Sequence, residues 1–330
     1  MEYMNENNGI LDPVNHELTQ NELTDNNFIS FLDKLTDVPS SIPLNPIVID
    51  RAGIENQTAY VKIKSLFTDN YVPVFCNISM QVELVGHRGI HMSRCEEALF
   101  ELINDKFETL DEFAEKLATK LIERQKSEKA YVVVEGQYSA ERKTKVTKRD
   151  SYDRLSLLVD CVATNKEVKS RVGIKAFNMT GCPCTETYTK FSVVPKLKDA
   201  GFNLEQIKEI LNITNSGTHT QRGLACLILD KSDTAISHRA IYDVLDKSCH
   251  LVYELLKRPD EHELVIRALR RPQFTEDVVR DTVLNTIKDL GKYLKSSDRI
   301  TATSQLFDSI HIHDVCTRID QTVGEIKKQL

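Results

Sequence analysis

A strict alternation of apolar and mostly polar residues between positions 72 and 84 constrains the fold more than any other feature of this 330-residue chain. The apolar side chains occupy every second position: Val72, Val74, Cys76, Ile78, Met80, Val82 and Leu84. This period is typical of a β-strand that buries one face. A similar alternation at 59–64 predicts an antiparallel partner strand just before it.

The pattern then changes to that of helices, and the resulting order of elements occurs twice. One helix is predicted at 96–103. A second helix, ending near residue 126, is predicted because Phe113, Leu117 and Leu121 lie four residues apart and therefore on one face. Strands at 130–135 and 155–162 follow. The second half repeats the order, with predicted strands at 168–177 and 224–229, helices over 241–256 and 279–290, and strands at 293–303 and 311–319. We expect an α+β protein with two antiparallel sheets, each carrying a helix pair on one face.

Charge and cysteine content narrow the class of protein further. A net charge of −6 gives no reason to expect a nucleic-acid partner. No apolar run approaches the roughly 20 residues that cross a bilayer, and the polar N-terminus lacks the apolar core of a signal peptide. Eight cysteines without a secretory signal are expected to stay reduced. These features predict a soluble, cytoplasmic protein that binds neither membrane nor nucleic acid.

The most unusual local feature is the sequence Cys182-Pro183-Cys184, which directly follows a predicted strand and is expected to form a turn. The proline fixes φ and stiffens the turn, so that the two sulfurs can point in different directions. A thiolate is both a nucleophile and a soft ligand for zinc or iron. The alternative is two small buried residues at a strand end, and the spacing alone does not decide between them.

Two histidine-containing segments are further candidates. The glycine-bounded loop 217–223 carries His219, which would bind a ligand or simply be solvated. In a strand over 311–319, His311 and His313 would project to the same side, one as a metal ligand and the other to orient it or bind substrate. The alternative for this pair is a polar surface on an edge strand.

Two acidic and one basic segment complete the set. Glu276 lies near a predicted helix start, where a carboxylate is favoured by the helix dipole. Glu261 lies in an acidic run that is typical of a solvated corner. Neither residue needs a functional role unless other residues provide the context for one. Arg88 and Arg94 flank a glycine and a helix start, which is a natural phosphate site. A turn followed by an N-cap at Ser93 is the competing interpretation, although it leaves the arginines unexplained.

Taken together, six motifs in order resemble the type IB family of GTP cyclohydrolase I, over roughly residues 45–320. They are RGIHMSR at 88–94, CPC at 182–184, GTHTQR at 217–222, KRPDE at 257–261, FTEDVVRD at 274–281 and SIHIH at 309–313. The resemblance implies a tunnelling fold with two β-β-α-α-β-β modules. It divides the chain into a polar N-terminal extension at 1–45, a first module at 46–165 and a second at 166–330.

The resemblance also implies the activity. The enzyme would be a hydrolase acting on a cyclic amidine C–N bond, converting GTP and water to 7,8-dihydroneopterin triphosphate and formate at the start of folate and pterin synthesis. It would assemble as a homotetramer with active sites at subunit interfaces. One divalent metal, zinc, manganese or iron, would lie in each site.

By the same resemblance, each candidate residue acquires a role. The metal ligands are Cys182, Glu261 and His311, with His219 at the metal or beside it. Cys184, together with His219, takes part in catalysis. The substrate-binding residues are Glu276, which holds the guanine edge, Arg88 and Arg94, which hold the triphosphate from a neighbouring subunit, and His313, a candidate for substrate binding or proton transfer.

The chain departs from the family pattern at several positions. Asp308 replaces an expected glutamate and Ile312 an expected proline, while Thr220 and Gly223 are variants in the histidine loop. None removes a proposed ligand. Two alternatives remain: an archaeal-type ferrous enzyme that yields a cyclic phosphate product, and a non-catalytic relative that binds metal or nucleotide. The presence of Cys184 and Glu276 argues against the second.

Overall fold

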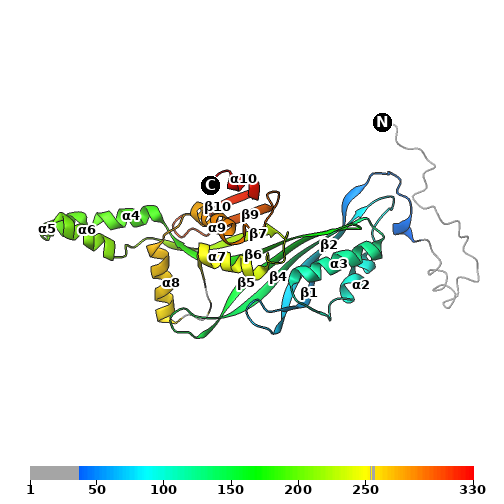
Figure 1. Ribbon diagram of the computed structural model, residues 1–330, viewed down its shortest axis with the longest axis horizontal. Coiled ribbons are helices and arrows are strands. Elements are labelled where there is room, and N and C mark those ends of the chain that lie inside the picture. The colour runs from blue at the N-terminus through cyan, green and yellow to red at the C-terminus, as the bar shows by residue number, and fades with distance from the viewer. Residues whose placement is uncertain (1–36, 253, 255–256) are drawn as a thin grey trace, which may run out of the picture.

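The protein is described by a computed structural model that covers residues 37–252, 254 and 257–330. A single large sheet runs through the molecule (Figure 1). Its strands are β1 (Ile49–Lys64), β2 (Tyr71–Leu84), β3 (Lys106–Phe107), β4 (Lys129–Lys143), β5 (Asp150–Thr164), β6 (Val168–Gly181), β7 (Thr220–Asp230), β8 (His250–Leu251), β9 (Arg299–Leu306) and β10 (Val315–Thr322). The helices are the 3-10 helix η2 (Val38–Ser40), α2 (Met92–Phe100), α3 (Leu110–Gln125), α4 (Pro183–Ser192), α5 (Val194–Asp199), α6 (Leu204–Ile213), α7 (His238–Ser248), α8 (Arg258–Arg270), α9 (Thr275–Leu290) and α10 (Val323–Lys327).

The strand order is β10-β9-β7-β6-β5-β4-β2-β1-β3, with β8 paired to β6. All neighbours are antiparallel except the short pair β1 and β3. This corrects the expectation of two separate sheets. Residue 165, where we placed the boundary between modules, lies in the turn between β5 and β6, and these strands pair from Leu155 with Ala176 to Ala163 with Val168. Backbone hydrogen bonding therefore continues across both halves of the chain.

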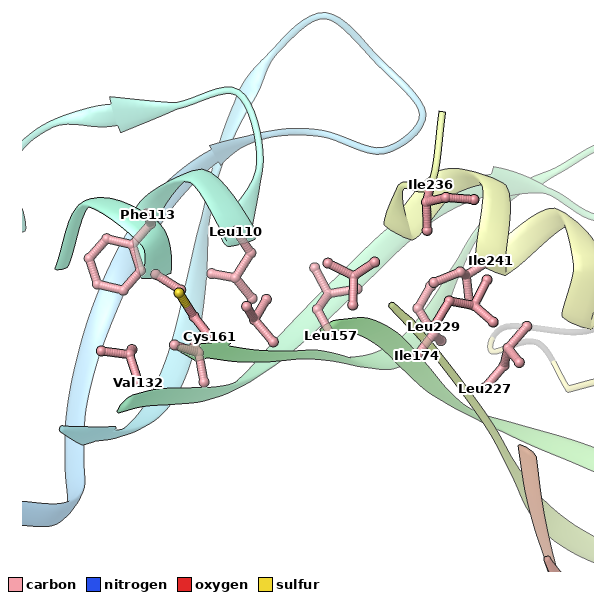
Figure 2. Packing of buried hydrophobic residues seen from close by; sticks show 14 of the residues in the cluster. Leu110, Phe113, Val132, Leu157, Cys161, Ile174, Leu227, Leu229, Ile236 and Ile241 are labelled. Carbon is pink, nitrogen blue, oxygen red and sulfur yellow. The ribbon is translucent and has the colours of Figure 1, made fainter. Parts of the chain in front are cut away.

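One face of the sheet carries the core. Paired positions across the strands place Leu157, Ile174, Leu227 and Ala302 in one row, and all four are buried. Helix α3 packs on β4 and β5, while α7 packs on β6 and α9 on β9. Figure 2 shows Phe113 and Leu110 of α3 over Cys161, and Ile241 of α7 close to Leu227 and Leu229. The apolar cluster is continuous from one half to the other.

The periodicity predicted most of these elements, with several differences. The predicted helix over 241–256 ends at Ser248, and β8 follows; part of its remainder lies outside the described residues. Helices α4, α5, α8 and α10 were not predicted. The first residues of the extension, 1–36, also lie outside the described part, and η2 precedes the first strand. None of the helices within 37–252 and 257–330 combines the length and apolar content that a membrane crossing needs.

Candidate active site

The candidate site lies at one end of the strands, where β6 and β9 end and β7 begins; we call this end of the sheet its edge. Gly181, the last residue of β6, pairs with Thr220, the first of β7, and Gly223 pairs with Leu306 at the end of β9. Three connections therefore leave the sheet side by side. They carry the CPC, histidine-loop and SIHIH motifs respectively.

The CPC motif begins a helix instead of forming the isolated turn that we expected. Cys182 is the N-cap of α4 in extended conformation, and Pro183 occupies the first helical turn, where a proline loses no hydrogen bond. Cys182 is half-buried, whereas Cys184 lies in the first turn of α4 and is exposed. The two thiols therefore differ in surroundings: one stands at the sheet edge and the other on the helix surface.

His219 lies directly against Cys182. The Cys182 amide donates to the His219 carbonyl over 3.2 Å, and the Thr218 hydroxyl donates to the Cys182 carbonyl over 2.8 Å. This approach requires glycine at 181, since a Cβ there would lie 2.8 Å from Thr218 Cγ2. The His219 Nδ1 is 3.0 Å from Gln221 Oε1. The ring is thus oriented by Gln221, a buried residue to which the sequence reasoning gave no role.

The two histidines of the SIHIH motif lie in the loop between β9 and β10, not in a strand as predicted, since β10 begins at Val315. Their rings nevertheless stack, with centroids 5.3 Å apart. Ser309 Oγ reaches within 3.4 Å of His219 Nδ1. The loop therefore adjoins the Cys182 and His219 pair.

Asp308 shapes this loop. Its Oδ1 accepts hydrogen bonds from the amides of Ile310 at 2.8 Å and His311 at 3.0 Å, and lies 3.2 Å from His311 Nδ1. These interactions, led by the Ile310 amide, lower the pKa of Asp308 to about 2. A charged carboxylate at this position competes with strand pairing and explains the wrong strand prediction. It also leaves Nε2 of His311 as the nitrogen directed away from the carboxylate.

Glu276 also belongs to this edge. The hydroxyl of Thr275 donates to the Ser304 carbonyl over 3.1 Å, and the Gln273 amide donates to Thr180 Oγ1 over 3.3 Å. The Thr180 hydroxyl in turn donates to the Gln273 carbonyl. These buried contacts fix the start of α9 beside the last residues of β6. Glu276, in the first turn, is exposed there.

Glu261 stands apart from this group. The neighbouring Asp260 accepts hydrogen bonds from the Val146 and Thr147 amides, at 2.9 and 3.0 Å, and so ties the start of α8 to the turn between β4 and β5. Ala268 follows Glu261 by seven residues and lies on the same face of α8. Its carbonyl oxygen is 3.8 Å from the position that a Cβ atom on Gly181 would occupy, so this part of α8 adjoins the end of β6. A separation of seven residues along a helix is about 10 Å. Glu261 thus faces the correct side of α8 but is two turns away from the end of β6.

Arg88 and Arg94 lie at the opposite edge of the sheet. The paired residues Val82 and Ala130, then Ala163 and Val168, place the end of β2 beside the start of β6, whereas Cys182 follows its end. A strand of this length spans roughly 40 Å. Within one protomer these arginines therefore lie too far from Cys182 and Cys184 to contact one small molecule together with them.

Their own surroundings form a separate pocket. The Arg88 amide donates to the Ser41 carbonyl over 2.8 Å, and Asp37 lies 2.7 Å from His91 Nε2 and 3.8 Å from Arg94. A cavity of about 520 Å³ opens here, lined by residues that include His87, His91 and Arg94. The basic motif is thus preorganised by the segment that precedes β1.

The structure therefore brings only some of the candidate site residues together. Cys182, His219 and the loop with His311 and His313 adjoin, and Glu276 stands at the same edge, while Glu261, Arg88 and Arg94 lie elsewhere. Within the part of the chain that the structure describes, no three His, Cys, Asp or Glu side chains are placed to hold a metal ion.

Comparison with known proteins assigns the chain to a family. Residues 35–317 match the family described as type I GTP cyclohydrolase folE2, and the chain belongs to that family. This description takes the place of the type IB label that the sequence resemblance suggested. The chain is 29% identical to GTP cyclohydrolase MptA of Methanococcus aeolicus over 309 residues, which cover 89% of this chain and 99% of the relative. It is 26% identical to the MptA protein of Methanobrevibacter smithii over 310 residues, with 90% and 98% covered.

Solved structures give only a weak similarity. A uricase from Arthrobacter globiformis aligns with a TM-score of 0.43 at 8% identity, covering 86% of this chain and 95% of the uricase. A similarity at this level carries no conclusion about fold family or function.

Proposed function

We propose that this chain is a metal-dependent GTP cyclohydrolase that converts GTP and water to 7,8-dihydroneopterin triphosphate and formate. The observation that carries the proposal is the junction of Cys182 with His219 next to the Asp308-braced histidine loop, in a chain of the GTP cyclohydrolase family. Oligomeric assembly, the tunnelling fold and a role in folate or pterin synthesis form part of the same proposal.

The donor set fits a divalent transition metal in chemical type. Cys182 would supply a thiolate and His219 and His311 imidazoles, while Glu261 would supply a carboxylate after movement of α8 or from another protomer. When bound, zinc, manganese or ferrous iron would supply Lewis-acid chemistry, which would make a water molecule nucleophilic enough to attack C8 of the purine. In one protomer the described residues provide only part of this set.

The remaining residues at this end of the sheet would take the roles that the resemblance implies. The Glu276 carboxylate can accept hydrogen bonds from the N1–H and N2–H groups of guanine, which adenine does not offer as a pair. His219 donates from Nδ1 to Gln221 Oε1, which leaves Nε2 as the nitrogen that would accept a proton or bind a metal. The exposed thiol of Cys184 is available to contact the purine. His313, whose ring stacks on that of His311, would serve in substrate binding or proton transfer.

The test is an assay of full-length protein loaded in turn with zinc, manganese or ferrous iron. Formate release and a pterin that fluoresces after oxidation are expected from GTP and not from ATP. Absence of both products with all three metals would contradict the proposal. The boiled protein and the Cys184→Ala variant serve as controls.

The archaeal-type alternative that the sequence resemblance left open gives a second candidate product. It is a dihydroneopterin cyclic phosphate, formed by a ferrous enzyme with loss of pyrophosphate from the side chain. Mass spectrometry of the pterin product separates the two outcomes, because only the first retains all three phosphates.

A further inference from the structure

A cavity of about 780 Å³ opens between α7, α8 and the turn that joins β4 to β5. Figure 1 shows α8 standing beside this turn, and the hydrogen bonds from the Val146 and Thr147 amides to Asp260 hold the two together. None of the residues assigned above to the metal or to GTP lines this cavity. We call it the α8 cavity.

One face of α8 forms a wall of the α8 cavity. The residues along this wall recur every three or four positions, which places them on one side of the helix: Pro259, Glu263, Ile266 and Arg270. Glu261 lies on a different face, the one that carries Ala268. The cavity is therefore separate from the candidate active site, although the same helix borders both.

Basic side chains outnumber acidic ones in the lining. Five of the lining residues are basic, namely Lys145, Lys247, Arg267, Arg270 and Arg271, and two are carboxylates, Asp246 and Glu263. Lys247 and Arg271 form ion pairs with carboxylates of α9, at 2.9 and 2.5 Å. The other three basic residues are Lys145, Arg267 and Arg270.

Arg267 carries buried hydrogen-bond donors that no described residue accepts. Its Nη2 atom is buried without a hydrogen-bond partner, and its Nε atom lies 3.2 Å from Glu263 Oε1 but also makes no hydrogen bond. A buried donor left in this state loses its hydration without compensation. The planar guanidinium group matches two oxygens of a phosphate, which would supply the acceptors.

Lys145 lies in the same electrostatic environment. Burial lowers the pKa of its ammonium group, and the positive charge of Arg267 lowers it further, while Asp246 acts in the opposite direction. The two carboxylates of the cavity therefore do not offset the burial of this cation. An anion bound near Lys145 and Arg267 would favour the charged form of the lysine.

A buried acceptor limits the ligand further. Asp246 Oδ1 makes no hydrogen bond and lies 3.9 Å from Arg142 Nη2. It can accept a hydrogen bond from a hydroxyl group. A ligand that satisfies both Arg267 and Asp246 thus carries an anionic oxygen group and a hydroxyl donor, as a sugar phosphate does.

We propose that the α8 cavity binds a small phosphorylated molecule, with Arg267, Lys145 and Arg270 around its phosphate and Asp246 accepting from a hydroxyl group. The volume of the cavity lies within the range of small-molecule sites, about 300–1,000 Å³. Arg270 Nε also donates to Asn215 Oδ1 over 3.4 Å, two residues before the histidine loop. A bound phosphate would therefore hold α8 against the segment that leads to His219.

Calorimetric titration of the full-length protein tests the proposal, with no metal added and at constant ionic strength in chloride. The two probes are inorganic phosphate and ribose 5-phosphate. We expect one ribose 5-phosphate to bind per chain, more tightly than phosphate, because only the sugar offers a hydroxyl donor to Asp246. Binding of neither probe would overturn the proposal, and equal affinity for both would contradict the role of Asp246.

Substitutions locate the bound probe. Arg267→Gln should raise the Kd for ribose 5-phosphate about 10- to 100-fold, the range for losing a hydrogen bond to a charged group. Arg239→Gln is the matched control on α7, because Arg239 is 50% exposed, pairs with Asp243 and does not line the cavity. Arg94→Gln at the opposite end of the sheet should also leave the Kd unchanged. Loss of binding in Arg94→Gln but not in Arg267→Gln would place the phosphate elsewhere and overturn the proposal.

Hydrogen exchange separates ligand binding from a purely structural role of Arg267. Ribose 5-phosphate should slow exchange of the amides at 144–149 and 258–271 in the wild type but not in Arg267→Gln. Lys145→Gln provides a second variant in case the arginine substitution unfolds the chain, which a circular dichroism spectrum would reveal. Unchanged exchange of both segments in the wild type would contradict the proposal.

The GTP assay separates this inference from the proposed function. A protein that binds ribose 5-phosphate in the α8 cavity but does not act on GTP would keep the inference and lose the proposed function. A protein that is active on GTP but binds neither probe would do the reverse.

Discussion

The backbone nitrogen of Cys182 donates a hydrogen bond to the carbonyl oxygen of His219, 3.2 Å away, and so joins the start of α4 to the start of β7. The backbones of these two residues, 37 positions apart in the sequence, are consequently held side by side. Cys184 lies two residues further along, in the first turn of α4, and takes no part in this hydrogen bond. The two cysteines should for this reason respond differently to substitution.

Cys182→Ala should lose bound metal and GTP turnover together, because it removes a proposed ligand at the sheet edge. Cys184→Ala should retain the metal and lower kcat by about 100- to 10,000-fold, the range of a group that acts in proton transfer or direct contact. Elemental analysis beside the GTP assay distinguishes them. Equal metal content and equal turnover in both variants would exclude separate roles.

Glu276→Gln should weaken GTP binding by about 1–3 kcal/mol, because an amide cannot accept both hydrogen bonds from the guanine edge. This corresponds to a rise of about 5- to 150-fold in Kd, measured by calorimetry. Asp277→Asn, one residue along in the same helical turn, is the matched control and should leave GTP binding nearly unchanged. Equal effects of the two substitutions would point to helix-end charge instead of base recognition.

Asp308→Ala should release the loop that carries His311 and His313 without unfolding the protein. We expect metal affinity or turnover to fall about 10- to 100-fold, as for other groups that orient a ligand. Asp314→Ala removes a different acid of the same loop, one that accepts a hydrogen bond from Gln305 over 2.9 Å, and should have a smaller effect. A thermal unfolding curve checks that both variants are folded.

The carboxyl group of Asp260 should make the free energy of unfolding depend on pH in the acidic range. Burial alone would raise the pKa of its carboxyl, but hydrogen bonds from Thr147 and Val146 outweigh it and lower the pKa to about 2, against an ordinary value of 3.8. Since the folded pKa is depressed, the stabilisation is present above pH 3.8 and is lost as the pH falls toward 2. The difference in unfolding free energy between wild type and Asp260→Asn should therefore be constant near neutrality and shrink over that window. Urea titrations at several pH values measure it.

Leu157→Ala should destabilise the whole chain by about 2–5 kcal/mol, because the residue is fully buried in the central strand β5. Unfolding followed at two probes, one in each half, should shift equally. A shift at only one probe would show that the halves unfold separately.

Much of the sheet could be predicted from the sequence because alternation persists over whole strands. The apolar positions 72–84 coincide with β2, and the shorter runs at 130–135 and 155–162 fall within β4 and β5. Which strand lies beside which is not written in a local period, so one continuous sheet was mistaken for two. Apolar spacing also ran from α7 toward Leu256 without a break, whereas the chain turns at His250 to pair with Met179.

The site could be predicted as a set of residue types but not as a geometry. Cysteine, histidine and carboxylate motifs identified the chemistry, and two of the loops that carry them meet at Cys182 and His219. The alternation Ile-His-Ile-His at 310–313 favoured a strand, yet the Asp308 carboxylate accepts hydrogen bonds from the Ile310 and His311 amides, which a strand would use for pairing. Arg88 and Arg94 lie at the far end of the sheet because of the order of the strands, and the spacing of motifs along the sequence does not determine that order.

The unbroken hydrogen bonding between β5 and β6 has a practical consequence for dividing the protein. A cut in the turn after Thr164 would leave the 15-residue β5 and the 14-residue β6 as open edges, each with a row of unpaired amides and carbonyls. Long strands with unpaired backbone groups recruit other chains. Either half expressed alone should aggregate, whereas the two halves produced together should recover a soluble complex by pairing along that seam.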